Sequence, residues 1–472
     1  MITFDTWPWQ HWAQLTPHSI ALRARGADMS WRTLTARIDA LAAAWRHVGV
    51  TVSSGVALRG KNQLELLLAY LAALQCGARV LSINPQLPAE AMAQRLATLN
   101  IDFGWCAEGL PWGAGIVALN LTELPPGGSL TPAWQVNRLA TLTLTSGSTG
   151  QPKAAAHTFA AHLASAQGVI ELMDFQHRHS WLLSLPLFHV SGQGIVWRWL
   201  ASGATIGLAQ ELPLEQALAG YTHASLVPTQ LWRLLRGDTT GLSLRDVLLG
   251  GATIPTDLTQ QAQALGVRCW SGYGLTEFAS TVCGKRADLS PGVGTPLRGR
   301  EVRLVDNEVW LRGSSMASGY WQQGRLIPLT DDAGWFHTRD GGRFVDGELH
   351  ITGRLDNLFF CGGEAVQPED VERALAAHPA VRQSFVVPVD DAEFGQRPVA
   401  IVDADTPLSE LRAWLEPLLS PWQRPVAFFS LQQALAADNM ASGQPIAPSD
   451  GSIKIPRNRL REWVAAQLPL NH

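Results

Sequence analysis

The sequence has few charged residues and no long run of either sign, which excludes several classes of protein. Charged residues make up 16% of the 472 residues, and the formal net charge is −4. Proteins that bind nucleic acids or anionic membranes electrostatically need a concentrated basic surface, and the sequence has no basic run to supply one. Hydrophobic residues make up 46%, so the chain can bury a large interior and is not intrinsically disordered.

Cysteine is also scarce. The five cysteines are scattered and never form a C-x-x-C pair: Cys76, Cys106, Cys269, Cys283 and Cys361. Such a set predicts buried thiols in a reducing compartment rather than disulfides or a zinc site. The richest apolar stretch, residues 64–73, is too short to span a bilayer. Residues 1–9 lack a cationic region followed by an apolar one, so we expect no signal peptide and a cytoplasmic protein.

Lysine is the rarest of the common charged residues. Only four of the 36 basic residues are lysine: Lys61, Lys153, Lys285 and Lys454. A genome that favours arginine codons would explain this bias without any functional reason. Where lysine persists against the bias, however, we expect a need for a compact ammonium rather than a planar guanidinium.

Apolar runs that alternate with segments of helical spacing predict an α/β fold. Helical spacing covers residues 34–48 and 64–74, and strand-like runs cover 55–58 and 78–83. The pattern continues through residues 140–144, 162–172, 181–185 and 247–249. Strands that alternate with helices of this length favour parallel βαβ units, so we expect a large N-terminal domain of parallel βαβ layers.

The pattern changes in the last third of the chain. Residues 301–305 and 308–311 are short alternating strands, and we expect a small β subdomain over 301–347. Further on, residues 368–377 have helical spacing and 381–389 read as a strand, which predicts a small, mobile α+β C-terminal domain. We place the domain boundary so that the domains are 1–354 and 355–472. Residues 434–452 are rich in Ala, Ser, Gly, Pro and Asp, and we expect a mobile loop there.

A phosphate-binding loop is predicted directly after the apolar run 140–144. The loop, TSGSTGQPK, contributes the candidate nucleotide-binding residues Thr145, Ser146, Gly147, Ser148, Thr149, Gly150 and Lys153. Small residues let backbone N–H groups approach phosphate oxygens, and Lys153 adds a point charge. It is not a Walker loop, because Pro152 lies between the last glycine and the lysine. A flexible turn is the alternative, but the nine residues in this order resemble the phosphate motif of the adenylate-forming superfamily, which includes acyl-CoA synthetases, peptide adenylation domains and luciferases.

Four further motifs of that superfamily follow in order. They are GYGLTE at 272–277, TRD at 338–340, GRLD at 353–356 and KIPR at 454–457. Each alone could be an ordinary turn or a surface cap. The resemblance implies nucleotide-binding roles for Gly272, Tyr273, Gly274, Thr276, Asp340 and Arg354, a magnesium ligand in Glu277, and a hinge at Asp356. A carboxylate beside a triphosphate requires a divalent cation between them, held by oxygen ligands.

Lys454 is the candidate catalytic lysine. It is the only lysine after residue 285 in a chain that otherwise uses arginine. The resemblance implies that it bridges the substrate carboxylate and the α-phosphate, where negative charge develops in the transition state. Thr276, Glu277, Arg354 and His189 complete the predicted catalytic set. The sequence departs from the superfamily pattern at Phe360, where a lysine is usual, and at Ile453, where a glycine is usual.

The acyl pocket is predicted from residues 184–200, SLPLFHVSGQGIVWRWL. An arginine inside this apolar helical run, Arg198, is costly to bury without an anionic partner. It could pair with a protein carboxylate or extend to the surface, or it could bind a second carboxylate on the substrate. His189 is either a packing residue or a polar contact to the acyl group. The other candidate lining residues are Ser191, Gly192, Ser225, Thr229, Gly250, Gly251, Gly274 and Thr276, and the glycines at 250 and 251 are also assigned to the nucleotide.

Four segments resemble one particular family within this superfamily. Residues 144–158, 184–200, 223–235 and 272–283 resemble the o-succinylbenzoate–CoA ligase family of menaquinone biosynthesis. That resemblance implies an aromatic dicarboxylic acid as substrate, with ATP, Mg²⁺ and coenzyme A, and with no nucleic acid or membrane insertion. Two alternatives remain: a CoA ligase for another aryl or medium-chain acid, and a stand-alone adenylation module that loads a carrier protein. The sequence leaves both a monomer and a homo-oligomer open.

Overall fold

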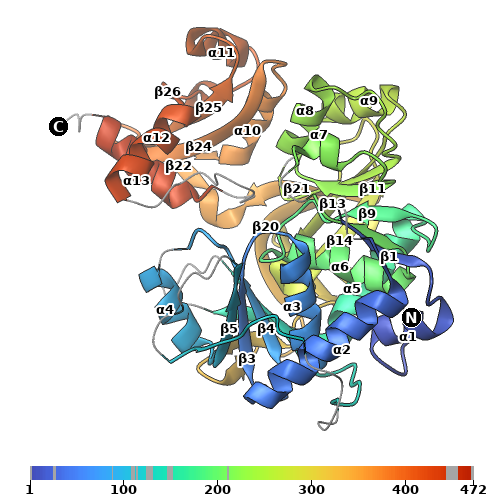
Figure 1. Ribbon diagram of the computed structural model, residues 1–472. Coiled ribbons are helices and arrows are strands. Elements are labelled where there is room, and N and C mark those ends of the chain that lie inside the picture. Colours follow the sequence, from blue (N-terminus) through green and yellow to red (C-terminus); the bar gives the residue numbers. More distant parts are fainter. Residues whose placement is uncertain are drawn as a thin grey trace.

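The computed structural model describes residues 3–24, 28–87, 89–107, 112, 115–123, 131–145, 153–209, 212–252, 254–442 and 455–468. Within these ranges, no helix has the length and apolar character needed to cross a membrane. Figure 1 shows the orange and red C-terminal elements as a separate lobe beside the larger body formed by the blue to yellow part of the chain.

A twisted sheet runs through the second half of the large body. Its order is β15 (Thr295–Pro296), β14 (Ser280–Arg286), β13 (Arg268–Leu275), β12 (Asp246–Leu249), β11 (His223–Leu226), β9 (Ser180–Leu182), β10 (Thr205–Gly207), β1 (Ile20–Arg23) and β2 (Met29–Ser30). The strands from β13 to β1 pair in parallel, and β14, β15 and β2 pair antiparallel at the two edges. The predicted α/β class with parallel βαβ units is confirmed.

A second sheet is built from the first part of the chain. Its order is β19 (Arg325–Ile327), β18 (Gly319–Gln322), β8 (Ala154–Thr158), β7 (Leu139–Leu144), β4 (Arg79–Ile83), β3 (Gly55–Arg59), β5 (Phe103–Cys106) and β6 (Val117–Ala118). The strands from β7 to β6 are parallel, and β8, β18 and β19 pair antiparallel. The antiparallel pair β7–β8 is the one that carries the predicted phosphate loop at its turn.

Helices pack between the two sheets and form the main hydrophobic core. The helices of the large body are α1 (Pro8–Leu15), α2 (Trp31–Val48), α3 (Leu64–Gln75), α4 (Ala89–Thr98), α5 (Phe159–Met173), α6 (Val190–Ser202), α7 (Leu214–Ala217), α8 (Pro228–Arg236) and α9 (Thr256–Ala264). One buried cluster joins α2, α3, α5 and α6 to strands of both sheets. Trp31 and Trp199 stack in it with ring centroids 5.2 Å apart. Large flat rings fill the space between two sheets efficiently, which accounts for part of the high tryptophan content.

The last third of the chain forms the predicted smaller units. A β subdomain consists of β16 (Arg300–Val305), β17 (Glu308–Gly313), β20 (Phe336–Val345) and β21 (Glu348–Arg354). The C-terminal sheet has the order β23 (Glu364–Val366), β22 (Phe359–Cys361), β25 (Gly395–Ala404) and β24 (Val381–Asp391), with β26 (Ala427–Ser430) beside β25. Around it lie α10 (Pro368–Ala376), α11 (Leu408–Leu415), α12 (Leu431–Ser442), α13 (Arg457–Gln467) and the 3₁₀ turn Pro421–Gln423.

The expectation of a loop over residues 434–452 is wrong for its first part. Helix α12 continues to Ser442, while residues 443–452 lie outside the described part. Leu431 and Ala434 are buried against α13 and the C-terminal sheet. Alanine has the highest helix propensity, and the apolar anchor Leu431 precedes the segment in which no periodicity was visible.

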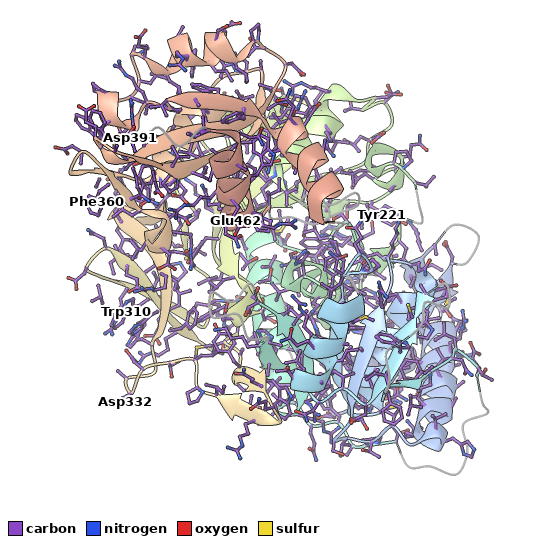
Figure 2. All side chains as sticks on the ribbon, turned by 90° about the vertical axis from the view of Figure 1, so that its left-hand side faces the viewer. Tyr221, Trp310, Asp332, Phe360, Asp391 and Glu462 are labelled. Carbon is purple, nitrogen blue, oxygen red and sulfur yellow. The ribbon has the colours of Figure 1, made fainter. Side chains whose placement is uncertain are left out.

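The chain between the β subdomain and the C-terminal sheet is short. Strand β21 ends at Arg354, and the 3₁₀ turn Leu355–Asn357 leads into β22. The side-chain amide of Gln367 donates to the carbonyl oxygen of Arg354 over 3.0 Å. Figure 2 shows Phe360 on the outer side of this region, and 56% of its surface is exposed. We propose that the domain boundary and the hinge at Asp356 lie here.

Candidate active site

The parallel strands of the first sheet end at a common edge, and the predicted pocket residues follow those ends. Strands β9, β11, β12 and β13 are neighbours and parallel. Thr229 follows β11 in the first turn of α8, and Gly250 and Gly251 follow β12 directly. Ligands of open α/β sheets bind at the carboxyl ends of the strands. The fold therefore gathers these residues at one edge, where their contacts with a substrate remain predictions.

The phosphate loop connects β7 and β8. Leu144 pairs with Ala154, and the backbone N–H of Thr145 donates to the carbonyl oxygen of Lys153 over 3.4 Å. Ser146, Gly147, Ser148, Thr149 and Gly150 lie outside the described residues. The Thr145 hydroxyl is buried and has no hydrogen-bond partner in the described part of the chain. A buried hydroxyl without a partner costs free energy, so this atom fits a site that is completed by a ligand.

Glu277 and Lys153 both contact the side chain of one tyrosine, Tyr320. Glu277 belongs to the 3₁₀ turn Thr276–Phe278, and its Oε1 accepts a hydrogen bond of 2.7 Å from the Tyr320 hydroxyl. The ammonium of Lys153 lies 3.9 Å from the centroid of the same ring. In the described ranges no group of three or more His, Cys, Asp or Glu side chains could hold a metal. Glu277 therefore fits an ion such as Mg²⁺ that takes one protein carboxylate and keeps water and phosphate oxygens as its other ligands.

A second cluster surrounds Asp340. Its Oδ2 accepts a hydrogen bond of 2.6 Å from the Tyr273 hydroxyl, and its Oδ1 lies 3.0 Å from Nη1 of Arg354. Arg354 also contacts Asp356 over 3.1 Å and donates to the carbonyl oxygen of Thr338 over 2.8 Å. Burial raises the pKa of Tyr273 well above its ordinary value, so the hydroxyl keeps its proton and donates. Each carboxylate oxygen has a lone pair left, so Asp340 is held in place and can still accept from ribose hydroxyls.

Arg198 is buried in the large body and has no carboxylate partner among the described residues. It is 1% exposed, and Nη1 donates to the Ser225 hydroxyl over 3.3 Å while Nη2 donates to the Ser280 hydroxyl over 3.5 Å. Its guanidinium lies 5.0 Å from the ring centroid of Trp181. None of the ion pairs of the described residues includes Arg198. The two structural alternatives, a protein carboxylate partner and extension to the surface, therefore do not describe it.

The electrostatics around Arg198 leave its charge uncompensated. Burial, together with the charge of the buried Arg300, lowers the pKa of Arg198 to about 9. The buried carboxylate of Asp246 is engaged elsewhere, 2.6 Å from Arg268. A cation that is desolvated and paired only with neutral hydroxyls is stabilised most by an anionic ligand.

Gly274 packs tightly against the backbone of the neighbouring strand β14. A β-bulge between β13 and β14 places it against Ser280, where an added Cβ would lie 1.8 Å from the Ser280 carbonyl oxygen. Ser280 itself has φ 108°, a conformation that non-glycine residues rarely adopt. The hydroxyl of Ser165 donates to the carbonyl oxygen of the preceding Ala279 over 2.6 Å and helps to hold the bulge.

We expect Gly274→Ala to lower the free energy of unfolding by about 1–3 kcal/mol and to abolish most of the ligase activity. The added methyl must displace the backbone that carries Ser280, and Ser280 is a partner of Arg198. Chemical unfolding and initial rates of pyrophosphate release would measure both effects. Gly237→Ala is the matched control, because its Cβ would lie 3.6 Å from the carbonyl oxygens of Arg233 and Leu234. Activity retained by Gly274→Ala would contradict the tight contact.

The start of α6 is a close turn against residues 185–187. Gly192 cannot carry a side chain there, because its Cβ would lie 2.1 Å from the carbonyl oxygen of Pro186. His189 is the N-cap of α6, and its ring lies 4.6 Å from that of Phe188. Ser191 follows in the first turn and is partly exposed. The catalytic role of His189 remains a prediction. Lys454 lies outside the described residues.

Three residues were missed in the sequence. Ser280 touches Arg198, and Tyr320 touches both Glu277 and Lys153. Ser280 lies three residues after the GYGLTE motif, but its backbone conformation has no sequence signal. Tyr320 is one of only four tyrosines in the chain. This scarcity was the one feature of the sequence that could have drawn attention to it. Asn62 was also missed: its amide donates to the carbonyl oxygens of Leu183 and Leu185 over 3.2 and 2.7 Å and fixes the segment before α6.

Comparison with protein families decides the classification. The model of the AMP-binding enzyme family matches residues 9–321, and the model of the AMP-binding enzyme C-terminal domain matches residues 370–438. The chain belongs to the AMP-binding enzyme family. Membership confirms the resemblance to adenylate-forming enzymes that the motifs predicted, and it confirms the adenylate-forming fold. The matched ranges include most of the large body and, from the C-terminal sheet, strands β24, β25 and β26.

Several similar proteins in this family are named 2-succinylbenzoate–CoA ligase. The chain is 53% identical to the 2-succinylbenzoate–CoA ligase of Salmonella typhimurium and 52% identical to that of Escherichia coli, over 98% of this chain and 99% of each relative. Among solved structures, an arginine-to-lysine variant of E. coli MenE with bound OSB-AMS has a TM-score of 0.89 at 51% identity, covering 98% of this chain and 99% of that one. MenE of Bacillus subtilis in complex with the acyl-adenylate OSB-AMP has a TM-score of 0.84 at 25% identity, covering 97% and 98%.

Proposed function

We propose that this AMP-binding enzyme is an acid–thiol ligase that joins 2-succinylbenzoate to coenzyme A in menaquinone biosynthesis. The acid first reacts with ATP to give an acyl-adenylate and pyrophosphate, and the CoA thiol then displaces AMP. The observation that carries the choice of acid is Arg198, a buried cation whose described polar partners are the hydroxyls of Ser225 and Ser280. The relatives that share its fold and half of its sequence carry the same ligase name.

The geometry divides the site into two ends. Glu277, Lys153 and Asp340 offer the charges that suit magnesium, phosphate and ribose. Arg198 offers the charge that suits the benzoate carboxylate, while the succinyl carboxylate is the one that is activated. Gly274 lies in β13 between Tyr273, which touches Asp340, and the turn that carries Glu277. Strand β14, which pairs antiparallel with β13, carries Ser280, the partner of Arg198. This strand pair therefore links the nucleotide end to the acyl end, and a dicarboxylate would place one carboxylate at each.

The chain's own residues act by positioning and by neutralising charge, because the first step needs no covalent enzyme intermediate. Magnesium, when bound with ATP at Glu277, supplies charge neutralisation at the phosphates. Lys454 is proposed to approach the carboxylate and the α-phosphate during this step, and Asp340 to hold the ribose. We propose a cytoplasmic location, where ATP and CoA are available; assembly into a homo-oligomer remains a proposal.

Pyrophosphate release tests this function. Purified protein is supplied with Mg-ATP and, separately, 2-succinylbenzoate, benzoate or a medium-chain fatty acid, with and without CoA. We expect strong release only with 2-succinylbenzoate and a thioester only when CoA is added. Release with another acid would retain the adenylation chemistry and reject the proposed substrate. Adenylate formation without transfer to CoA would favour a stand-alone adenylation module instead.

A further inference from the structure

Tyr320 occupies a junction of three chain segments. It lies on β18, which pairs antiparallel with β8 so that Tyr320 is opposite Ala155, two residues after Lys153. The backbone N–H of Ala317 donates to the carbonyl oxygen of Glu277 over 2.8 Å, and that of Ser318 donates to the carbonyl oxygen of Ala156 over 2.8 Å. Backbone hydrogen bonds therefore fix the position of the tyrosine relative to both charged residues.

The tyrosine side chain contacts two groups of opposite charge in two different ways. Its hydroxyl donates to Oε1 of Glu277 over 2.7 Å, and its ring face carries the Lys153 ammonium at 3.9 Å from the centroid. An ionised carboxylate only accepts hydrogen bonds, so the tyrosine hydroxyl is the donor in this pair.

The ring also keeps the two charges apart. No ion pair joins Lys153 to Glu277, although both are described residues that contact the same side chain. A direct Lys–Glu ion pair would have to be broken before the carboxylate could bind a cation and the ammonium could bind phosphate. A carboxylate that accepts one hydrogen bond on Oε1 still has lone pairs on both oxygens for a metal ion.

We propose that Tyr320 is a positioning residue that holds the Glu277 carboxylate ready for the magnesium ion of Mg-ATP and holds Lys153 away from that carboxylate. This role rests on the proposed function, because it requires that the protein binds ATP. Hydrogen-bond partners of metal-binding carboxylates orient them, and their loss typically weakens metal affinity or activity by 10- to 100-fold.

Calorimetric titration without any acid tests this role in the complete protein. ATP is titrated with and without Mg²⁺ into the wild type and into Tyr320→Phe, which retains the ring and loses only the hydroxyl. In the wild type, we expect Mg²⁺ to raise the affinity for ATP. In Tyr320→Phe we expect this increase to be about tenfold smaller, while the affinity for metal-free ATP stays unchanged. We expect Tyr320→Leu to weaken metal-free binding as well, because Lys153 loses the ring on which it rests.

Tyr273→Phe is the matched control, because it removes the other buried hydrogen bond from a tyrosine to a site carboxylate, 2.6 Å to Asp340. It should weaken ATP binding equally with and without Mg²⁺. A Tyr320→Phe protein with the wild-type magnesium gain, or with equal losses in both titrations, would overturn the role of Tyr320 alone. A wild-type protein that binds no Mg-ATP would overturn both this role and the proposed function.

Discussion

Replacing Lys454 with alanine is expected to slow adenylate formation by about 10²- to 10³-fold while leaving thioester formation from supplied acyl-adenylate near the wild-type rate. Negative charge builds up between the acid carboxylate and the α-phosphate only in the first half-reaction, and a positioned ammonium stabilises it there. We propose that the C-terminal domain rotates between the halves, which would withdraw the lysine before CoA attacks.

Two assays on the same preparation separate the halves. Pyrophosphate release reports the first, and chromatography of the thioester made from added adenylate and CoA reports the second. The matched control is Arg461→Ala, which removes a cation from the nearby helix α13, where Arg461 lies 3.7 Å from Asp390 at an exposed surface. The control should be active in both assays. Equal losses of rate in both half-reactions for Lys454→Ala would contradict a role for Lys454 in the first half-reaction alone.

The parts of the site that could be predicted are those whose functional residues lie next to one another in the sequence. Residues 145–153 and 272–277 each place small residues, hydroxyls and one charged group within a short stretch of sequence, so order and spacing alone carry the information. Arg198 was predictable for a different reason: an arginine between two tryptophans in an apolar helical run has a physical cost that a pattern can reveal. Its burial at 1% exposure agrees with that cost.

Other features depend on pairings that the linear sequence does not contain. Tyr320 lies beside Lys153 because β18 pairs with β8 and sets Tyr320 opposite Ala155, a residue far away in the sequence. Ser280 reaches Arg198 because a bulge gives it a φ of 108°. Helix α12 was missed because its stabilisation comes from packing of Leu431 and Ala434 in a tertiary core.

Arg198→Met is expected to lower kcat/KM for 2-succinylbenzoate by about 10²- to 10³-fold, since an anion left in a buried site without its cation costs about 3–5 kcal/mol. The comparison substrate is 4-oxo-4-phenylbutanoate, which retains the succinyl carboxylate and the ketone but lacks the benzoate carboxylate. Its kcat/KM should change little. Methionine resembles the arginine stem in length and flexibility, so it fills the space beside Trp181 without the charge.

The same variant should be more stable than the wild type. The guanidinium is buried at a cost, and its partners Ser225 and Ser280 are neutral, so we expect the free energy of unfolding to rise by about 1 kcal/mol or more at neutral pH. The sign follows from burial, which lowers the pKa of Arg198 to about 9 because the charged form is disfavoured in the folded protein.

A structural role and a substrate-binding role predict opposite changes in the free energy of unfolding for Arg198→Met. If the guanidinium served mainly to hold α6 to β11 and β14, its loss would destabilise the protein and slow both acids equally. If it serves to bind the second carboxylate, stability rises while selectivity for the dicarboxylate falls. Chemical unfolding at pH 7 and the ratio of kcat/KM values for the two acids therefore decide between the roles, because a residue kept at a cost to stability must be kept for what it binds.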